Sequence, residues 1–362
     1  MQIAALEIDS LRILSKVRVD LAPGGNLFKG VNGAGKTAVL EAVHLLATGR
    51  SFRPGGPRGL IRHGESGLRI RVRLDSGLWL ALERSTSGGF RGRRGSDAVR
   101  RMSDLARELP VQLLLPDAAE LVFGGPGERR SALDWGLFHV EHGFQALSRE
   151  YTQSLKQRNA LLRRSQLSGT RPNKELSVWT HKVAEAGEQL TQMRLDYVER
   201  LSGQFAATLH SLSPELNLTI DYQPGHSPEQ LLVQLEEDTL RELKLGTTKF
   251  GPHRADLRIR LMDRLAGSVL SRGQGKIAAF SMRLAQAKDL RDQAGIAPVF
   301  LVDDLGAELD RPHNERLFQV LRDLDSQVLA TTAMDQLSWG EDWQLFHVEQ
   351  GSVTSRSGLS SQ

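Results

Sequence analysis

The stretch Gly30-Val31-Asn32-Gly33-Ala34-Gly35-Lys36-Thr37 decides the fold of this 362-residue chain. It matches the pattern GxxxxGK[ST] and lies between a short predicted strand at 26–30 and a segment at 37–47 whose apolar residues have helical spacing, so we expect strand, loop and helix. The glycines allow backbone N–H groups to turn inward around phosphates. Lys36 is expected to reach the β- and γ-phosphates, and Thr37 to hold Mg²⁺. The sequence therefore predicts an α/β protein that binds ATP at this loop.

A second motif carries two carboxylates. The apolar run Val299-Phe300-Leu301-Val302 is followed directly by Asp303 and Asp304. Such a run is typical of a buried strand whose carboxyl end faces the ligand in an α/β sheet. We expect Asp303 to position Mg²⁺ through a water molecule and Asp304 to act as the general base on the attacking water. Two acids after a strand can also form an ordinary turn, but beside a phosphate loop the catalytic interpretation is favoured.

A third motif is Leu270-Ser271-Arg272-Gly273-Gln274. A serine and a glycine at the start of a helix offer a hydroxyl and unpaired N–H groups to an anion. We therefore add Ser271 and Gly273 to the residues expected to contact ATP.

The rest of the chain alternates between two patterns. Residues 2–22 and 68–84 alternate apolar and polar positions and predict paired strands. Residues 85–97, rich in Gly, Ser and Arg, are expected to form a mobile loop. Residues 144–166 and 174–212 have helical spacing and are separated by turn residues, which predicts an antiparallel helical arm.

The predicted organisation has three segments. Residues 1–140 would form an ATPase lobe with the phosphate loop and a basic, strand-rich part, and residues 141–215 an inserted helical arm. Residues 216–362 would contain the Ser271 motif and the Asp303 strand, and would return the chain to the first lobe. A further helix is predicted within them at 228–244.

Composition narrows the function classes. The chain has no cysteine, which excludes disulfides, thiol catalysis and cysteine-ligated metal. No segment approaches the roughly 18–20 apolar residues of a membrane span, and the amino terminus has no signal-peptide pattern. A cytoplasmic protein is the expectation. The ten histidines show no HxxxH or HExxH spacing, so we expect no metal site beyond Mg²⁺.

Positive charge is concentrated in one part of the chain. The net charge is only +4, yet residues 50–107 contain fourteen arginines, no lysine and five acids. Arginine suits bidentate contacts with phosphate, and a basic lobe on a nearly neutral protein favours a polyanion partner. Solvated surface arginines are the alternative that the sequence leaves open.

Four further stretches carry a family resemblance. They are Gly49-Arg50-Ser51-Phe52-Arg53, Gly125-Pro126-Gly127-Glu128-Arg129-Arg130 with its continuation to His139, Leu155-Lys156-Gln157-Arg158-Asn159, and Gly251-Pro252-His253-Arg254-Ala255-Asp256-Leu257. With the three motifs above, they resemble the RecF family of bacterial DNA repair and replication proteins over roughly residues 1–352. The resemblance implies a P-loop ATPase head of the ABC and SMC type with an inserted α-helical arm.

The resemblance also implies a mechanism. In such heads Ser271 of one protomer would meet the γ-phosphate bound by a second copy, so the complete site would exist only in an ATP-bound homodimer. Arg53 and Gln112 are candidates for contact with the γ-phosphate and with the Mg²⁺-bound water. His253 is open between a structural role and contact with DNA or nucleotide. The expected activity is a weak, DNA-stimulated ATPase used as a switch.

The implied partners are nucleic acid and repair proteins. The resemblance predicts binding to single-stranded gaps and gap/duplex junctions in DNA, cooperation with the mediator proteins RecR and RecO and, indirectly, with the recombinase RecA, and a part in the SOS response. The strand 328–332 ends in Thr331-Thr332 where many ABC ATPases have a switch histidine, which favours slow hydrolysis.

Two other functions share the phosphate loop. The ATPase subunit of a membrane transporter would share the Ser271 motif as well, although the helical arm and the Gly251–Leu257 stretch argue against it. A P-loop kinase for a small metabolite would leave the Ser271 motif unused.

Overall fold

The computed structural model describes residues 1–53, 59–169, 174–227, 230–304, 309–334 and 343–355. The chain divides into two compact units. The first contains Met1–Ala118, Ser211–Ser213 and Phe280–Gln362, and the second contains Ala119–His210 and Pro214–Ala279. No helix in the described part of the chain is long and apolar enough to cross a membrane.

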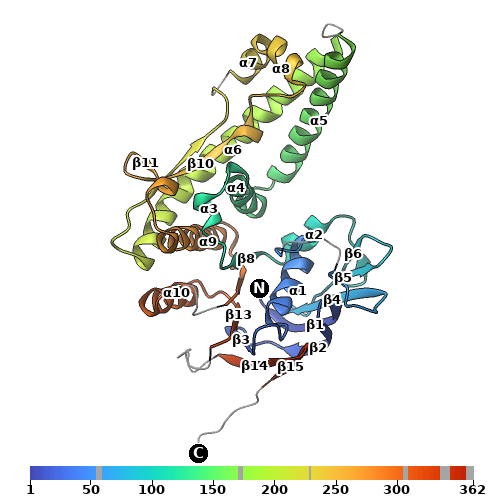
Figure 1. The fold of residues 1–362 in the computed structure, drawn as a ribbon, viewed down its shortest axis with the longest axis vertical. Helices are drawn as coiled ribbons and strands as arrows, with labels where there is room; N and C mark the ends of the chain where they lie inside the picture. Colours follow the sequence, from blue (N-terminus) through green and yellow to red (C-terminus); the bar gives the residue numbers. More distant parts are fainter. Residues whose placement is uncertain (54–58, 170–173, 228–229, 305–308, 335–342, 356–362) are drawn as a thin grey trace, which may run out of the picture. The chain divides into compact units, whose positions relative to one another are not determined.

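The first unit contains two six-stranded sheets (Figure 1). Its strands are β1 (Ile3–Leu11), β2 (Leu14–Asp20), β3 (Gly25–Lys29), β4 (Gly67–Leu74), β5 (Trp79–Ser85), β6 (Phe90–Arg94), β7 (Asp97–Ala98), β8 (Val111–Leu114), β12 (Val299–Val302), β13 (Val328–Thr332), β14 (Gln344–Glu349) and β15 (Ser352–Ser355). Its helices are α1 (Lys36–Thr48), α2 (Met102–Glu108) and α10 (Arg311–Asp323).

One sheet is antiparallel, in the order β2-β1-β4-β5-β6-β7. The other, β15-β14-β3-β13-β12-β8, is parallel from β14 to β8. Helix α1 contacts strands of both sheets, and its apolar side chains join theirs in one core. Since β3, β13 and β12 run side by side in the same direction, their carboxyl ends lie at one edge of the sheet, as the Asp303 motif predicted.

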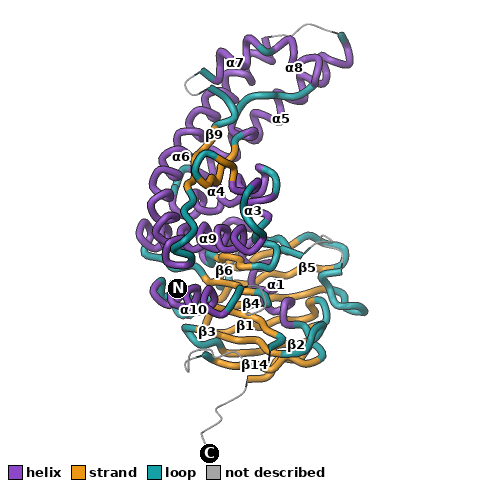
Figure 2. Tube along the Cα trace, turned by 60° about the vertical axis from the view of Figure 1, so that its left-hand side comes forward, coloured by secondary structure: helices purple, strands orange, loops and turns teal. Residues whose placement is uncertain are grey.

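The second unit is mainly helical. It contains α3 (Glu120–Phe123), α4 (Pro126–Val140), α5 (Phe144–Ser168), α6 (Lys174–Leu212), α7 (Leu231–Glu237) and α8 (Thr239–Leu245), the short 3₁₀ helices Pro252–Arg254 and Ala266–Ser268, and a sheet of β9 (Thr219–Gln223), β10 (Asp256–Leu261) and β11 (Arg264–Leu265). Helix α9 (Arg272–Ala294) begins in this unit and ends in the first. Figure 2 shows α5 and α6 as the long helices of this unit, with α7 and α8 near one end.

The two arm helices were predicted from sequence within a few residues of their ends, but the segment boundaries were not. Residues 119–140 and 216–279 belong to the second unit with the arm. One contact that joins these two segments is the pair of hydrogen bonds, of 2.7 and 3.1 Å, that Arg129 on α4 donates to Asp256 on β10. The predicted single helix at 228–244 is two helices, α7 and α8. The predicted mobile loop at 85–97 is wrong, since it contains β6 and the first residue of β7.

Two family motifs meet in the interior of the second unit. Arg158, with no exposed surface, donates to Glu242 (2.6 Å), which is equally buried, and to the hydroxyls of Thr248 (2.8 Å) and Thr180 (3.0 Å). These bonds join α5 to α6, to α8 and to the segment before the Gly251–Leu257 stretch. The Leu155–Asn159 motif is therefore part of the internal framework of this unit.

His253 belongs to the same interior. Its Nε2 donates to the carbonyl of Thr248 (3.2 Å), so that Nδ1 accepts from the Tyr151 hydroxyl (2.6 Å). Burial lowers the pKa of His253 to about 4, which keeps the ring neutral at physiological pH. Of the two roles left open by the sequence, the described contacts support the structural one.

Candidate nucleotide-binding site

The phosphate loop joins β3 to α1 and depends on its glycines. Gly33 and Gly35 have φ of 82° and 114°, in the left-handed region that favours glycine. A Cβ on Gly30 would collide with the carbonyl oxygen of Val348 on β14, and one on Gly35 would approach the side chain of Leu14 to 2.9 Å. The loop is therefore held in its compact turn by the neighbouring strands.

Lys36 folds back over the loop. Its side chain is almost fully buried, and Nζ donates to the carbonyl oxygens of Gly30 (2.9 Å) and Val31 (3.1 Å). These neutral oxygens satisfy the ammonium group without neutralising its charge. A buried cation with no carboxylate partner among the described residues is suited to an anionic ligand such as a phosphate.

Three strand ends bring the polar groups together. Thr37 at the start of α1 donates to Oδ1 of Asp303 (3.0 Å), which follows β12. Thr331 near the end of β13 donates to the same oxygen (2.6 Å) and accepts from the backbone N–H of Asp304 (2.9 Å). Asp304 itself has a φ of 56°, unusual for a residue other than glycine. The sequence predicted the proximity of Thr37 and Asp303 but not the role of Thr331.

The oxygen atoms of Thr37 and Asp303 suit Mg²⁺. A hydroxyl and a carboxylate are hard oxygen ligands, and Mg²⁺ in nucleotide sites takes one or two such protein ligands, with water and substrate phosphates completing its shell. Among the described residues, no group of three or more His, Asp or Glu could hold a metal alone. The donor set fits a metal that is bound together with a phosphate ligand.

A cavity of about 640 Å³ opens over the loop. This is within the range of small-molecule sites. Besides Asn32, Gly33, the residues from Gly35 to Ala38, Asp304 and Thr331, its lining includes Arg12, Ile13, Gly59, Ile61 and His63. Those five come from the β1–β2 turn and the segment before β4. None was predicted, because a single arginine or isoleucine in an alternating strand gives no sign that the turn reaches the phosphate loop.

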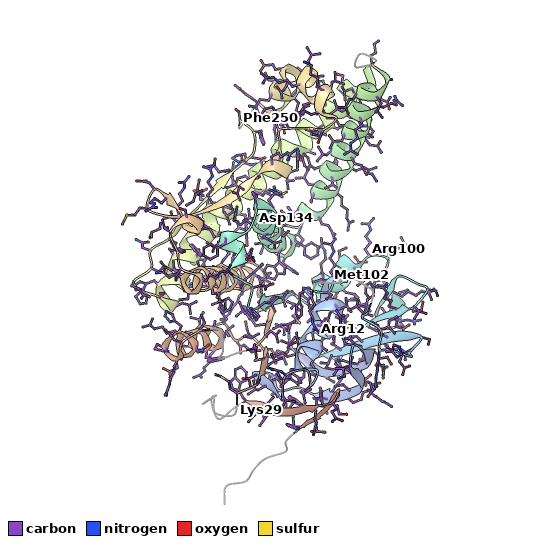
Figure 3. All side chains as sticks on the ribbon, viewed as in Figure 1. Arg12, Lys29, Arg100, Met102, Asp134 and Phe250 are labelled. Atoms are coloured by element: carbon purple, nitrogen blue, oxygen red, sulfur yellow. The ribbon has the colours of Figure 1, made fainter. Side chains whose placement is uncertain are left out.

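Glu41 fixes the positive side of this cavity. It is fully buried on α1 and accepts from Arg12 (3.1 and 2.8 Å) and from the hydroxyl of Ser51 (2.5 Å). The guanidinium of Arg53 lies 3.8 Å from the same carboxylate, and Arg53 lines the cavity. Figure 3 shows Arg12 beside α1. Contact between Arg53 and a phosphate remains a prediction, and its placement is compatible with it.

The described residues do not place Gln112 in the cavity. It is buried on β8, and its amide nitrogen lies 3.4 Å from the amide oxygen of Gln286 on α9. The predicted contact with the Mg²⁺-bound water has no support in this arrangement, because the strand register directs the side chain into the packing of the unit.

Ser271 and Gly273 belong to the second unit and are not among the described cavity-lining residues. Ser271 lies at the start of α9, where its hydroxyl accepts from the N–H of Gln274 (3.2 Å) and its own N–H donates to the Gln274 side chain (3.0 Å). This reciprocal pair is a capping box, which orders the turn and leaves Ser271 exposed. The expected contact with a nucleotide on a second copy remains a prediction.

Residues 5–97 match the AAA domain family. The chain is 40% identical over 356 residues to the DNA replication and repair protein RecF of Thioalkalivibrio sulfidiphilus, covering 96% of this chain and 98% of the relative. It is 38% identical over 375 residues to RecF of Stenotrophomonas maltophilia, covering 98% and 100%. The chain belongs to the RecF family.

Solved structures agree on the fold. The recombination mediator protein RecF solved with ATP superposes with a TM-score of 0.89 at 24% identity, covering 98% of both chains. An SMC head bound to the winged-helix domain of ScpA has a TM-score of 0.61 at 16% identity, covering 99% of this chain and 98% of that one. The predicted ATPase head of the ABC and SMC type with a helical arm is confirmed. The relatives named here give no support to the transporter alternative.

Proposed function

We propose that this RecF-family chain is an ATP-dependent switch that binds DNA as a homodimer in recombinational repair and replication restart. The observation that carries the proposal is the convergence of Lys36, Thr37 and Asp304 on one cavity at the carboxyl ends of three parallel strands, where Thr37 donates to Asp303. The chemistry of this edge suits a nucleoside triphosphate with Mg²⁺, and a family relative has been solved with ATP.

Each residue has a role in the proposal. Lys36 and the loop N–H groups hold the phosphates, and Thr37 and Asp303 hold Mg²⁺, which neutralises phosphate charge when bound. Asp304 orients and deprotonates the attacking water. Ser271 of a second copy would contact the terminal phosphate. Loss of that phosphate would then release the dimer.

The expected substrates are gapped DNA and gap/duplex junctions, with RecR and RecO as protein partners and RecA loading as the outcome. The relative solved with ATP is a recombination mediator protein of the RecFOR pathway, which supports these partners. Because β13 ends in Thr331 and Thr332 rather than a histidine, we expect slow turnover that DNA stimulates.

The test combines nucleotide binding, sedimentation and DNA binding on gapped, single-stranded and duplex substrates, each with and without ATP. Lys36→Ala should lose ATP binding and dimerisation together, since the loop then lacks its buried cation. Asp304→Asn should bind ATP and accumulate as a dimer. If Asp304→Asn stays monomeric at saturating ATP, the shared-site model is wrong.

A further inference from the structure

Most arginines on the outer face of the antiparallel sheet are neutralised by neighbouring acids. Arg18 on β2 pairs with Asp9 (2.8 Å), and Arg69 on β4 pairs with Glu83 on β5 (2.8 Å). Arg71 pairs with Glu7, and Arg73 lies 3.8 Å from Asp20. Paired arginines present little net charge to a polyanion. The excess of arginines over acids counted in the sequence therefore does not make every part of this sheet positively charged.

Three arginines at one end of that sheet differ. Arg91 and Arg93 lie on β6 and Arg100 follows β7; all three are exposed, and none has an ion pair with a carboxylate in the described part of the chain. The nearest candidate on the neighbouring strand is Glu83, opposite Arg91, and its carboxylate is already held by Arg69. We call Arg91, Arg93 and Arg100 the basic edge.

The backbone carries these charges on one hairpin. Arg91 and Arg93, two residues apart on β6, lie on the same face of the strand. Arg93 is paired with Ala98, and the bond from the N–H of Val99 to the carbonyl of Gly92 (3.0 Å) extends the contact to the residue before Arg100. Val99 lies on the other face, where a Cβ on Gly92 would collide with it. Like charges carried this close together on one hairpin repel each other, and an anion lying against them would offset that repulsion.

The basic edge is also fixed in place. Gly92 packs close to Leu105 of α2, and Arg94 pairs with Glu108 of the same helix (2.8 Å). Figure 3 shows Arg100 at the periphery of its unit, beside the start of α2. The cationic groups are therefore carried on a packed β-hairpin, which reduces the entropy lost when they bind a ligand.

We propose that the basic edge contacts the phosphate backbone of DNA, a proposal that rests on the DNA-binding function proposed above. Residues two apart on a strand are about 6.6 Å apart, so three guanidinium groups spread along the hairpin suit a regular polyanion rather than one phosphate. No large apolar residue is exposed between Arg84 and Arg107, which disfavours an anionic membrane or a protein interface with an apolar core.

The test compares two variants with the same loss of charge. Arg93→Gln with Arg100→Gln removes two residues of the basic edge, and Arg18→Gln with Arg73→Gln removes two paired arginines from the same sheet. Binding of gapped DNA is measured by fluorescence anisotropy between 50 and 300 mM KCl with ATP. Thermal melting and ATP binding verify that each variant is folded.

Each phosphate contact contributes a slope of about −0.9 to log K against log salt. The basic-edge variant lacks two such contacts, so the magnitude of its slope should be about 1.8 smaller than that of the wild type. If the two proteins bind DNA equally at 1 M salt, the variant should bind about 60-fold more weakly than the wild type at 0.1 M salt. The control variant should keep the wild-type slope.

Three outcomes would overturn the proposal. Equal losses in both variants would show that net charge, rather than this edge, governs binding. A basic-edge variant with wild-type DNA affinity would place the contacts elsewhere, and if it also loses binding to phosphatidylserine vesicles, the edge faces lipid. Failure of the wild-type dimer to bind any DNA would instead refute the DNA-binding function itself.

Discussion

Thr331 gives the sharpest test of how the candidate site is built. Its buried hydroxyl donates to Asp303 (2.6 Å) and accepts from the backbone N–H of Asp304 (2.9 Å). Thr331→Val keeps the shape of the side chain and removes both bonds. The N–H of Asp304 then loses its acceptor while the residue holds a positive φ.

The expected loss can be bounded. A partly buried donor left without an acceptor costs about 1–3 kcal/mol. Loss of the hydrogen bond to the Asp303 carboxylate costs a similar amount, but the two losses share one hydroxyl and do not simply sum. We expect the free energy of unfolding to fall by about 2 kcal/mol, a fall in Tm of roughly 4–8 °C for a unit of this size. ATP turnover should fall at least about tenfold, because an effect of about 1.4 kcal/mol on the positioning of Asp304 is sufficient for that.

The matched control is Thr331→Ser, which keeps the hydroxyl and removes only the buried methyl group. It should lose about 1 kcal/mol of stability from the missing contact and retain near-wild-type turnover. Calorimetry and steady-state phosphate release measure both quantities. Wild-type turnover in Thr331→Val, or a larger turnover loss in Thr331→Ser, would refute the reasoning.

Three other outcomes follow from the described contacts. Arg158→Met should destabilise the protein by about 3–5 kcal/mol in chemical denaturation, because Glu242 is left buried and unpaired. Adding Glu242→Leu to the same chain should recover part of the lost stability. If the double variant recovers none of it, the ion-pair account is contradicted. Burial lowers the pKa of both His44 and His253 to about 4, so the unfolded chain binds more protons than the folded one between pH 6.5 and 4. The free energy of unfolding should be constant above about pH 7 and fall by up to about 3 kcal/mol per histidine as the pH falls through that window. A melting temperature that stays flat from pH 7 to 5 would exclude this effect. Ser271→Ala should bind ATP as well as the wild type yet dimerise more weakly in sedimentation, and a large loss of monomer affinity would exclude its action on a second copy.

The sequence predicted what is local and periodic. The phosphate loop, its flanking strand and helix, and the long helices α5 and α6 follow from short-range patterns. The proximity of Thr37 and Asp303 also follows, because the ends of neighbouring parallel strands meet at one edge.

Two features that the sequence did not predict have specific physical causes. The β6 strand was missed because the residue that faces the core is Gly92, so the sequence lacks the apolar side chain expected at that position of a strand. Leu105 and Val99 pack against Gly92 and fill that space. Arg12 was overlooked because only the folded chain brings it to Glu41.

Charge in this chain has meaning only together with its partners. Glu41 is buried in the helix that begins at the phosphate loop, and it holds Arg12 and Ser51 while lying close to Arg53. Segments far apart in the sequence thereby form one side of the cavity. On the antiparallel sheet the same pairing cancels positive charge, so an arginine count overstates what a polyanion meets. Whether a carboxylate orients an arginine toward a ligand or neutralises it depends on which other groups share that carboxylate, and this is decided by the fold.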